Sequence, residues 1–551
     1  MLATQEASKY DIMKILKVSC YALLFGLSSG ASISAARVGV EISRLVEGSD
    51  FHSINGVTVA SDGQLLTTSM GGETIHKFNI ATSEVSAVVM PAEGRSDDIV
   101  VSPSGDLIWT DPRSGVVRRR NGSGTIQEIA TGLRGVNSIA FTRDGKRLFV
   151  GQTGTGDGLW EIDPEGVREP RLVVAKTGGV NAFSFGPDGK IYGPVTLRNK
   201  LVRIDPESGA LETLVKGLHH PVSVRFDKKD EMYVVNGADG KLFRVDIASR
   251  SKQHIATVSP AVDNMSISPD GLAYISNMAD NAIIQVNLAS GDKRTLTQSA
   301  LAFPRDIDIV HNESGDVLYV ADGTAFRTID TSTGKVSEIA RRMTSPLRFP
   351  SGISVNSQHA VLVSEVLSDT PRSFVQVVDL KTGNFLYELT GFEAPSDAVE
   401  LSNGSVVVSE ALSGQLLHVD AGKRTVLVKG LRAPSSLALG RNNVLYVAES
   451  AAGRIARVAI DSQEVSEVIS GLGAIRAIAV APDHTLIALI SSGQLLAIDP
   501  ETKQSTVIAD HLPVGYLTLP YPRSGGLAVG HDGTVYVAAD KESAVYRVTR
   551  P

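Results

Sequence analysis

Short runs in which hydrophobic and polar residues alternate recur along the chain from about residue 38. GVNSIAFTRDGKRLFVGQ, which begins at Gly135, is a clear example: Ile139 and Phe141 share one face, an Asp-Gly turn follows, and a second apolar run begins. Alternation with a period of two predicts β-strands that each bury one face. No stretch keeps a 3.6-residue period for long, so the pattern excludes helical repeats.

The same unit can be read twelve times, at intervals of about 43 residues. Each unit holds an apolar alternation, a polar turn, a second strand, a variable loop and a third strand that ends near Asp. The other clear copies are GVNAFSFGPDGKIYGPV from Gly179, NMSISPDGLAYISN from Asn264, APSSLALGRNNVLYVAES from Ala433 and GGLAVGHDGTVYVAAD from Gly525. Weaker copies begin near Ser53, Ser96, His220, Pro304, Pro350, Ala394 and Ala474.

A repeat of this length with about four short strands is typical of one blade of a β-propeller, which hides its strand edges by radial repetition. The sequence therefore predicts an all-β fold of about twelve four-stranded blades. Because one ring usually has four to eight blades, we expect two six-bladed rings, over residues 37–300 and 301–551. A single large ring is the alternative.

The two ends of the repeat array are incomplete in complementary ways. The last unit stops at Pro551 after three strands, and VGVEISRL from Val38 is a strand without a blade. Pairing the Val38 strand with the last blade would close a ring and join the two ends of the chain.

Residues 1–36 have the layout of a secretory signal peptide. Lys14 and Lys17 precede an apolar run from Val18 to Leu27, and small residues up to Ala36 follow. The run is about half of the ~20 residues that a membrane-spanning helix needs, so we expect a removed signal, with an uncleaved anchor as the alternative. The sequence thus predicts a secreted or periplasmic protein with no membrane span after the signal is removed.

Composition excludes several classes of protein. The hydrophobic fraction of 42% argues against disorder, and a net charge of -7 without basic blocks argues against nucleic-acid binding. The single cysteine, Cys20, lies in the apolar run of the signal, so disulfides are not expected in the mature chain.

The repeat units resemble the six-bladed propellers of the NHL-repeat and senescence marker protein/gluconolactonase group. Members of that group carry Pro-x-Gly-Ile, Asp-Gly and Leu-Tyr-Val at these blade positions. The resemblance covers nearly the whole mature chain and implies a shallow funnel on one face, often with a divalent metal at its base held by Asn, Asp and Glu. It says less about activity, because hydrolases, lyases and binding modules share this framework.

Alignment of the units on their Asp-Gly turns marks one position in each, seven residues upstream, which should open the innermost strand at the tunnel mouth. In the first six units it is held by Asn55, Asp97, Asn137, Asn181, Val222 and Asp263. In the last six units it is held by Arg305, Ser351, Ser396, Ser435, Arg476 and Gly525. Only the first half therefore offers a ring of amide and carboxylate oxygens.

Mixed amide and carboxylate oxygens are the ligands that Ca²⁺ prefers, and the ring lacks the thiolate and imidazole groups that favour zinc. Lactonases and paraoxonases of this fold hold calcium with Asn and Asp at blade starts, and Asp263-Asn264 resembles the Asp-Asn pair of the paraoxonases. The resemblance thus implies a calcium site made of Asn55, Asp97, Asn137, Asn181, Asp263 and Asn264. The usual glutamate of the first blade is missing, with Asn55 in its place. The alternative is that these residues only cap turns.

A hydrolase would also need a general base near the calcium, because calcium acidifies bound water less than zinc does. The candidates on the same loops are His220, His52 and Asp98. A histidine titrates near neutral pH and could take a proton from water, although exposed loop histidines are common.

In the second half, Arg305 and Arg476, with Arg523 nearby, are expected to face acidic residues at the ends of the second strands: Asp322, Glu365, Glu410, Glu449 and Asp540. Structural ion pairs explain this pattern, and an anionic ligand is the alternative.

These observations favour an exported, calcium-dependent hydrolase of a lactone or related ester, with a small-molecule substrate at the propeller mouth. The alternative is a non-catalytic propeller that binds a protein, a glycan or a small ligand. A lyase on the same scaffold would need a His and Glu pair at the mouth, which the sequence does not locate.

Overall fold

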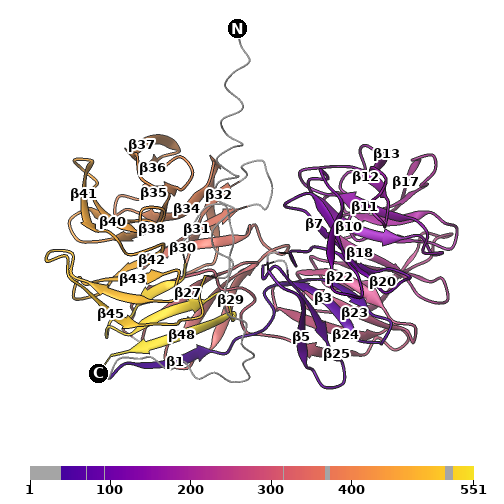
Figure 1. The fold of residues 1–551 in the computed structure, drawn as a ribbon, viewed down its shortest axis with the longest axis horizontal. Helices are drawn as coiled ribbons and strands as arrows, with labels where there is room; N and C mark the ends of the chain where they lie inside the picture. Colours follow the sequence, from indigo (N-terminus) through magenta and orange to yellow (C-terminus); the bar gives the residue numbers. More distant parts are fainter. Residues whose placement is uncertain are drawn as a thin grey trace, which may run out of the picture. The chain divides into compact units, whose positions relative to one another are not determined.

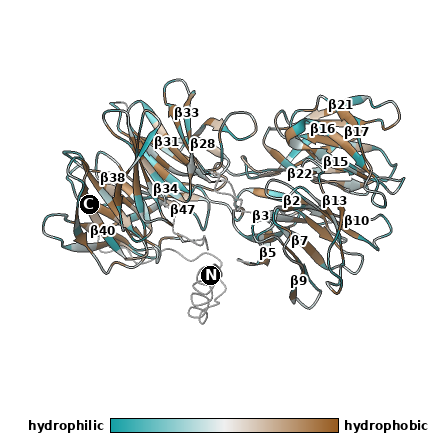
Figure 2. Cartoon of the chain, turned by 90° about the horizontal axis from the view of Figure 1, so that it is seen from above, coloured by the Kyte–Doolittle hydropathy of each residue, from teal (hydrophilic) through white to brown (hydrophobic). Residues whose placement is uncertain are grey.

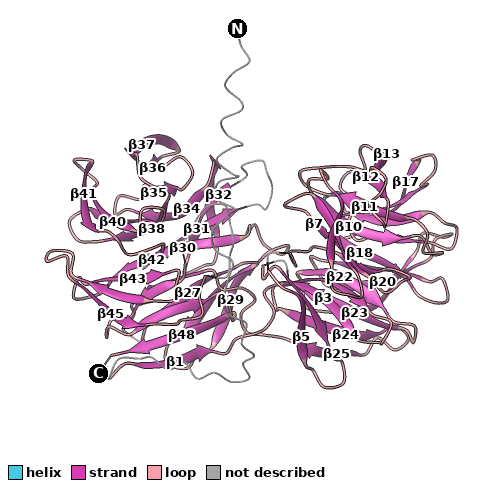
Figure 3. Cartoon of the chain, in the orientation of Figure 1, coloured by secondary structure: helices cyan, strands magenta, loops and turns pink. Residues whose placement is uncertain are grey.

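The computed structural model describes residues 39–550, apart from positions 70, 92, 314, 366–372 and 516–524. These residues form twelve four-stranded antiparallel sheets and one 3₁₀ turn, η1 (Thr196–Arg198), with no α-helix among them (Figure 3). No helix in this part of the chain could cross a bilayer. The all-β, twelve-blade prediction is confirmed, whereas the predicted signal peptide, residues 1–36, lies outside the described residues.

Each sheet follows the chain from an inner strand outward, and Figure 1 labels most of the strands. The inner strands are β2 (Ile54–Val59), β6 (Ile99–Val101), β10 (Val136–Phe141), β14 (Ser184–Phe185), β18 (Pro221–Phe226), β22 (Val262–Ile267), β26 (Asp306–Val310), β30 (Pro350–Val355), β34 (Pro395–Glu400), β38 (Pro434–Leu439), β42 (Ile475–Val480) and β46 (Leu527–Val529). The second strands are β3 (Leu65–Ser69), β7 (Leu107–Asp111), β11 (Leu148–Gln152), β15 (Ile191–Val195), β19 (Met232–Asn236), β23 (Leu272–Asn277), β27 (Val317–Asp322), β31 (His359–Glu365), β35 (Val406–Glu410), β39 (Val444–Glu449), β43 (Leu486–Ile490) and β47 (Val535–Ala539).

The third strands are β4 (Thr74–Phe78), β8 (Val116–Arg120), β12 (Leu159–Ile162), β16 (Lys200–Ile204), β20 (Lys241–Val245), β24 (Ala282–Asn287), β28 (Ala325–Asp330), β32 (Ser373–Asp379), β36 (Gln415–Asp420), β40 (Arg454–Ala459), β44 (Leu495–Ile498) and β48 (Ala544–Thr549). The outer strands are β5 (Val85–Val89), β9 (Ile126–Ala130), β13 (Arg171–Val174), β17 (Leu211–Lys216), β21 (Lys252–Thr257), β25 (Lys293–Thr297), β29 (Val336–Arg341), β33 (Phe385–Phe392), β37 (Lys423–Lys429), β41 (Glu464–Ile469), β45 (Ser505–Ala509) and β1 (Glu41–Val46).

The inner strands show how the sheets close into rings. From β2 to β22, and again from β26 to β46, each inner strand contacts the inner strand of the next sheet, while β22 contacts β2 and β46 contacts β26. The first six sheets and the last six therefore form two closed sets, called here the first ring (β2–β25) and the second ring (β26–β48 with β1). The domain limits at residue 300 stay a prediction.

The last sheet of the second ring is completed by the first strand of the chain. β1 pairs antiparallel with β48, from Glu41 opposite Thr549 to Val46 opposite Val545. In Figure 1 the indigo β1 lies beside the yellow β48. Residues from both ends of the chain thus share one sheet, as the unpaired strand at Val38 suggested.

Hydrophobic side chains fill the spaces between neighbouring sheets, and the brown residues in Figure 2 lie mainly on strands. Ile54 and Leu65 of the first sheet pack with Tyr274 of the sixth, which closes the core of the first ring. Val46 of β1 packs with Ile307 and Val545, which closes the core of the second ring. Alternate residues of each strand thus bury one face between sheets, as the sequence pattern requires.

Candidate functional site

The positions predicted to face the tunnel coincide with irregularities in the inner strands. In eight sheets the residue that the sequence alignment marked has no partner in the pairing of the inner strand with the second strand. The marked residue therefore lies outside the regular ladder of hydrogen bonds. A β-bulge of this kind redirects the side chain at a strand start. The bypassed positions include Asn55, Asn137, Val222, Asp263, Ser351, Ser396, Ser435 and Arg476.

Three of the predicted metal ligands influence one another in the first ring. Burial and the charges of Asp263 and Asp98 raise the pKa of Asp97 well above its usual range, while a hydrogen bond from Asn55 opposes the shift. Burial, with the charge of Asp98, raises the pKa of Asp263 to about 6. Two acidic groups so close together disfavour a state in which both are ionised, unless a cation lies between them. We call Asn55, Asp97 and Asp263 the first-ring cluster.

Asn55 provides the test of whether this cluster fits a cation. Its side chain is 2% exposed, and its Oδ1 is a buried acceptor without a hydrogen bond. An unsatisfied buried acceptor is costly, and a hard cation would satisfy it. The donor set of one amide oxygen and two carboxylates therefore fits Ca²⁺.

A positive charge from the second ring also reaches the first-ring cluster. Arg342 follows β29, and its half-buried guanidinium interacts with the charges of Asp263 and Asp97, which oppose the lowering of its pKa by burial. The guanidinium carbon of Arg342 lies 4.0 Å from the ring centre of Phe349. The backbone N–H of Arg342 donates to the backbone carbonyl of Thr324 at 3.0 Å. Sequence reasoning missed Arg342, because nothing in the repeat pattern places the loop after β29 at the mouth of the other ring.

The next residue fixes this loop against the first ring. Met343 has a φ of 73°, which is unusual for a residue with a side chain, and packs against the core cluster that contains Val222. A Cβ at Gly237 would lie 2.7 Å from the Met343 sulfur, so the absence of a side chain at Gly237 makes room for it. Residues of the second half of the chain therefore lie beside the first-ring cluster.

Asp98 is occupied by hydrogen bonds between sheets. Its carboxylate accepts from the N–H of Ile99 at 2.9 Å and of Ile139 at 3.2 Å, and from Nδ2 of Asn264 at 2.9 Å. Arg225 lies 4.0 Å away and offsets part of the rise in the pKa of Asp98 that burial causes. This arrangement favours a positioning role, and the predicted catalytic role of Asp98 stays untested.

The three remaining predicted ligands differ in their surroundings. Oδ1 of Asn264 accepts from Nη2 of Arg225 and from the N–H of Met265. Its Nδ2 donates to Asp98, so both the oxygen and the nitrogen of this amide are engaged. Oδ1 of Asn181 accepts from the N–H of Ala182 at 2.8 Å. Asn137 is half-buried, and its carbonyl accepts from Oγ1 of Thr110 at 2.6 Å.

The two candidate histidines lie in different environments. Burial and the charge of Arg342 lower the pKa of half-buried His220. Arg342 also interacts with Asp97 and Asp263, so His220 and the first-ring cluster share this guanidinium as a neighbour. His52 is 2% exposed, its ring lies edge-on to Phe303 at 5.6 Å, and burial lowers its pKa to about 4 although Asp540 opposes the shift. Only His220 therefore shares a charged neighbour with the cluster.

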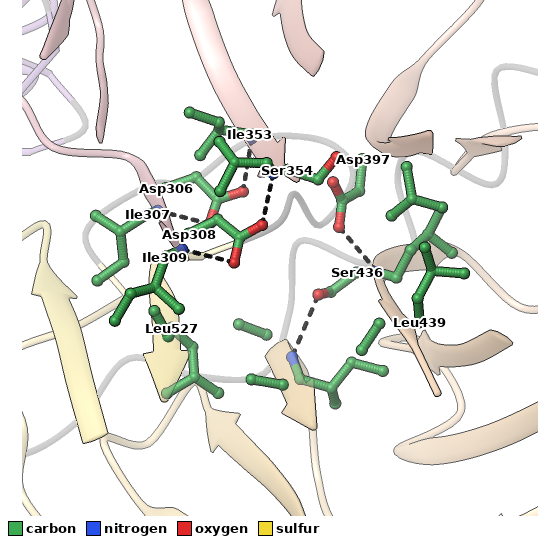
Figure 4. A pocket seen from close by; sticks show the side chains of 18 of the residues that line it. Asp306, Ile307, Asp308, Ile309, Ile353, Ser354, Asp397, Ser436, Leu439 and Leu527 are labelled. Atoms are coloured by element: carbon green, nitrogen blue, oxygen red, sulfur yellow. Dashed lines mark hydrogen bonds between the residues drawn. The ribbon is translucent and has the colours of Figure 1, made fainter. Parts of the chain in front are cut away.

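A partly open cavity of about 250 Å³ lies among the inner strands of the second ring (Figure 4). Asp306, Asp308 and Asp397 line it, and each accepts one hydrogen bond from the next residue of its own strand and one from the inner strand of the following sheet. Burial raises the pKa of Asp308 to about 6 and that of Asp397 to about 7. These carboxylates repeat the arrangement of Asp98.

The predicted arginines of the second ring are paired with protein groups where the structure describes them. Arg476 donates to Asp540 at 2.7 Å, and the guanidinium of Arg305 lies 5.5 Å from the ring centre of Phe303. Arg523 and the side chain of Glu365 lie outside the described part. The Arg476 contact agrees with the structural ion pairs that the sequence favoured.

Three solved structures align with the chain at low identity. A structure described as a candidate gluconolactonase is 16% identical, covers 44% of this chain and 91% of its own, and has a TM-score of 0.35. A Bacteroides thetaiotaomicron protein of unknown function is 11% identical over 46% of this chain and 75% of its own, with a TM-score of 0.37. The extracellular domain of a B. thetaiotaomicron protein named as a one-component system is 12% identical over 92% and 82%, with a TM-score of 0.32.

A family model gives a more direct relation. The model described as the SMP-30/gluconolactonase/LRE-like region matches residues 35–235, whereas no curated protein matches the chain significantly. The match includes Asn55, Asp97, Asn137, Asn181 and His220 and ends before Asp263. Residues 35–235 of this propeller protein are therefore similar to the SMP-30/gluconolactonase/LRE-like family.

Proposed function

We propose that the chain is a divalent-cation-dependent hydrolase of a lactone or a related ester, with its active centre at the first-ring cluster. One observation carries this proposal: Asp97 and Asp263 are close enough to interact electrostatically, beside a buried Asn55 oxygen that has no hydrogen bond. The family match over residues 35–235 supports the lactone as substrate class.

Asn55, Asp97 and Asp263 would hold the cation, for which calcium is the best candidate because every donor is oxygen. When bound, such an ion polarises the ester carbonyl and stabilises the charge that develops on its oxygen. Asn137 and Asn181, at neighbouring inner-strand starts, are proposed as further donors. Asn264 would instead orient Asp98, with which it shares a hydrogen bond of 2.9 Å.

The residues around the cluster would handle the proton and the substrate. Because the pKa of His220 is lowered, its imidazole is neutral at pH 7 and can accept a proton from the attacking water. Arg342 can donate hydrogen bonds to a carbonyl or an anionic group of the substrate. His52 is also neutral, but its neighbours Phe303 and Asp540 make it a second choice as the base.

Export belongs to the same proposal. The charged and apolar segments of residues 1–36 favour a secreted or periplasmic protein, where calcium is more abundant than in the cytosol. Mass spectrometry of the protein from the medium and the periplasm would test this. A mature N-terminus near residue 37 is expected, and a cytosolic chain that retains the segment would contradict export.

The activity is tested with a panel of γ- and δ-lactones and aryl esters, assayed with metal-stripped and calcium-reloaded protein. We expect turnover only after reloading, and a loss of about 100-fold or more in Asp97→Asn and Asp263→Asn. Asp270→Asn, on an exposed turn of the same sheet as Asp263, is the matched control and should keep full activity. Equal turnover by stripped and reloaded protein would contradict the proposal.

The charge of Arg342 favours a second candidate, a non-catalytic binding propeller. A guanidinium beside Asp97 and Asp263 can neutralise them without a metal ion. In that case calcium does not bind, no lactone is hydrolysed, and Asp263→Asn leaves the binding of a protein, glycan or small ligand nearly unchanged.

A further inference from the structure

Two histidines and one buried aspartate meet in the second ring, away from the first-ring cluster. His311 directly follows β26, Asp316 directly precedes β27, and His531 lies in the turn after β46. The Nδ1 atoms of His311 and His531 each lie 3.0 Å from a different carboxylate oxygen of Asp316. The side chain of Asp316 is 4% exposed, whereas those of His311 and His531 are 47% and 68% exposed.

We propose that His311, Asp316 and His531 form a binding site for a divalent transition metal, with zinc as the best candidate. Two imidazole nitrogens and one carboxylate oxygen suit zinc, whereas calcium prefers oxygen donors only. The proposal does not depend on the hydrolase assignment, because it concerns other residues and another metal.

The distances fit one shared ion. Two donor atoms that are each about 2.1 Å from a metal lie about 3.0–3.4 Å apart at octahedral or tetrahedral angles. Both nitrogen–oxygen distances of 3.0 Å fall in this range. The three donor atoms all lie within 4.8 Å of one another, so a small rotation of the two exposed rings would bring them onto one ion.

The surroundings hold the carboxylate and leave space around it. The N–H of His531 donates to Oδ2 of Asp316 at 2.9 Å, which fixes the carboxylate against the turn that carries the second histidine. A Cβ at Gly530 would lie 3.0 Å from the same oxygen, so a larger residue there would crowd the ligand. Because both imidazoles are partly exposed, a metal could enter from solvent and keep one position open for water.

The site would link the two ends of the second ring. His311 and Asp316 belong to its first sheet and His531 to its last, which is the sheet that β1 completes. A metal bound by all three side chains would therefore cross-link the first and last blades where the ring closes, and zinc should raise the thermal stability of the protein.

The test is a Zn²⁺ titration of untagged, chelator-treated full-length protein by calorimetry, with Co²⁺ absorption spectra as a second readout. Wild type should bind zinc at one site, with visible Co²⁺ bands and a higher Tm. His531→Ala, at a mostly exposed side chain, should weaken zinc affinity by about 100-fold or more and abolish the Tm increase. Asp316→Asn should do the same.

His359→Ala is the matched control, because His359 forms a similar pair with Glu400 at 2.9 Å in the same ring but is not part of this cluster. It should bind zinc as wild type does. Calcium binding should be unchanged in His531→Ala, which separates this site from the first-ring cluster. Zinc binding of equal affinity in wild type and His531→Ala, or no micromolar zinc binding to wild type, would overturn the proposal.

Discussion

The individual carboxylates of the two rings have different partners, and these partners decide what each can do. Asp97 and Asp263 interact with each other and with Arg342, whereas Asp98, Asp308 and Asp397 accept backbone hydrogen bonds from neighbouring sheets. The first pair is available to a ligand, and the second group holds sheets together. All five are buried or half-buried acids, so residue type alone could not separate these roles.

Removing the charge of Arg342 tests its place beside the first-ring cluster. Arg342→Met should raise calcium affinity by about tenfold, because a competing positive charge near Asp97 and Asp263 is lost. Calorimetry with wild type and the variant measures this. Arg348 is an exposed arginine in the same loop as Arg342 and pairs with Glu388 of β33. Arg348→Met is the control and should bind calcium like wild type. Unchanged affinity in Arg342→Met would show that the guanidinium does not act on the site.

The cavity carboxylates of the second ring predict how stability depends on pH. Burial raises the pKa of Asp308 to about 6 and of Asp397 to about 7, above the values of about 4 in an unfolded chain. Each group therefore stabilises the fold most below pH 4, and this contribution is lost as the pH rises through 6 to 7. Thermal unfolding between pH 4 and 8 should show it. In Asp397→Asn the loss of unfolding free energy between pH 4 and 8 should be smaller than in wild type by on the order of 2–4 kcal/mol. An identical pH dependence in both proteins would contradict a raised pKa at Asp397.

At the scale of strands, the repeat pattern predicted the alternating strands of each unit and where each blade begins. The alternation around Ile139 and Phe141 and the Asp-Gly turns were sufficient, because period-two patterning and turn chemistry are local. The bulges at the inner-strand starts were not predicted, since an extra residue in one strand leaves no mark in the sequence of that strand. The alignment marked the bypassed residues without showing that a bulge lies at each of them, and their orientation toward the tunnel stays a prediction.

The hydrogen bonds of Asp98 between sheets give a prediction at this scale. Asp98→Ala would remove acceptors for Ile139 N–H and Asn264 and would leave Arg225 buried without its acidic neighbour. Such a loss costs about 3–5 kcal/mol, to be measured by denaturant unfolding. Asp270→Ala, at an exposed turn, should cost less than about 0.5 kcal/mol. A fully stable Asp98→Ala protein without activity would instead point to a catalytic role for Asp98.

At the scale of the molecule, the first strand of the chain closes the second ring. β1 supplies the outer strand of the last sheet and buries Val46 in the core next to Val545. The incomplete final repeat and the unpaired strand at Val38 made this pairing predictable from the sequence. The approach of Arg342 to the other ring was not predictable, because it depends on the positions of loops and not on the repeat.

Deleting residues 39–47 tests the closure. The variant should lose the pairing along β48, expose an edge strand and the apolar surface around Val46, and unfold at a Tm several degrees lower or aggregate. Thermal scans with size-exclusion chromatography measure both effects. A synthetic peptide of residues 39–50 should restore part of the stability, and a deletion variant with unchanged Tm would show that β1 contributes little.

The most direct test of the proposed cation centre is a calorimetric Ca²⁺ titration of the metal-stripped protein at pH 7.5, with wild type, Asp97→Asn and Asn55→Ala side by side. The first-ring cluster predicts one site with a Kd of about 10⁻⁷–10⁻⁵ M in wild type, and a loss of at least tenfold in affinity in both variants. No calcium binding by wild type, or equal binding by all three proteins, would contradict a calcium centre at these residues.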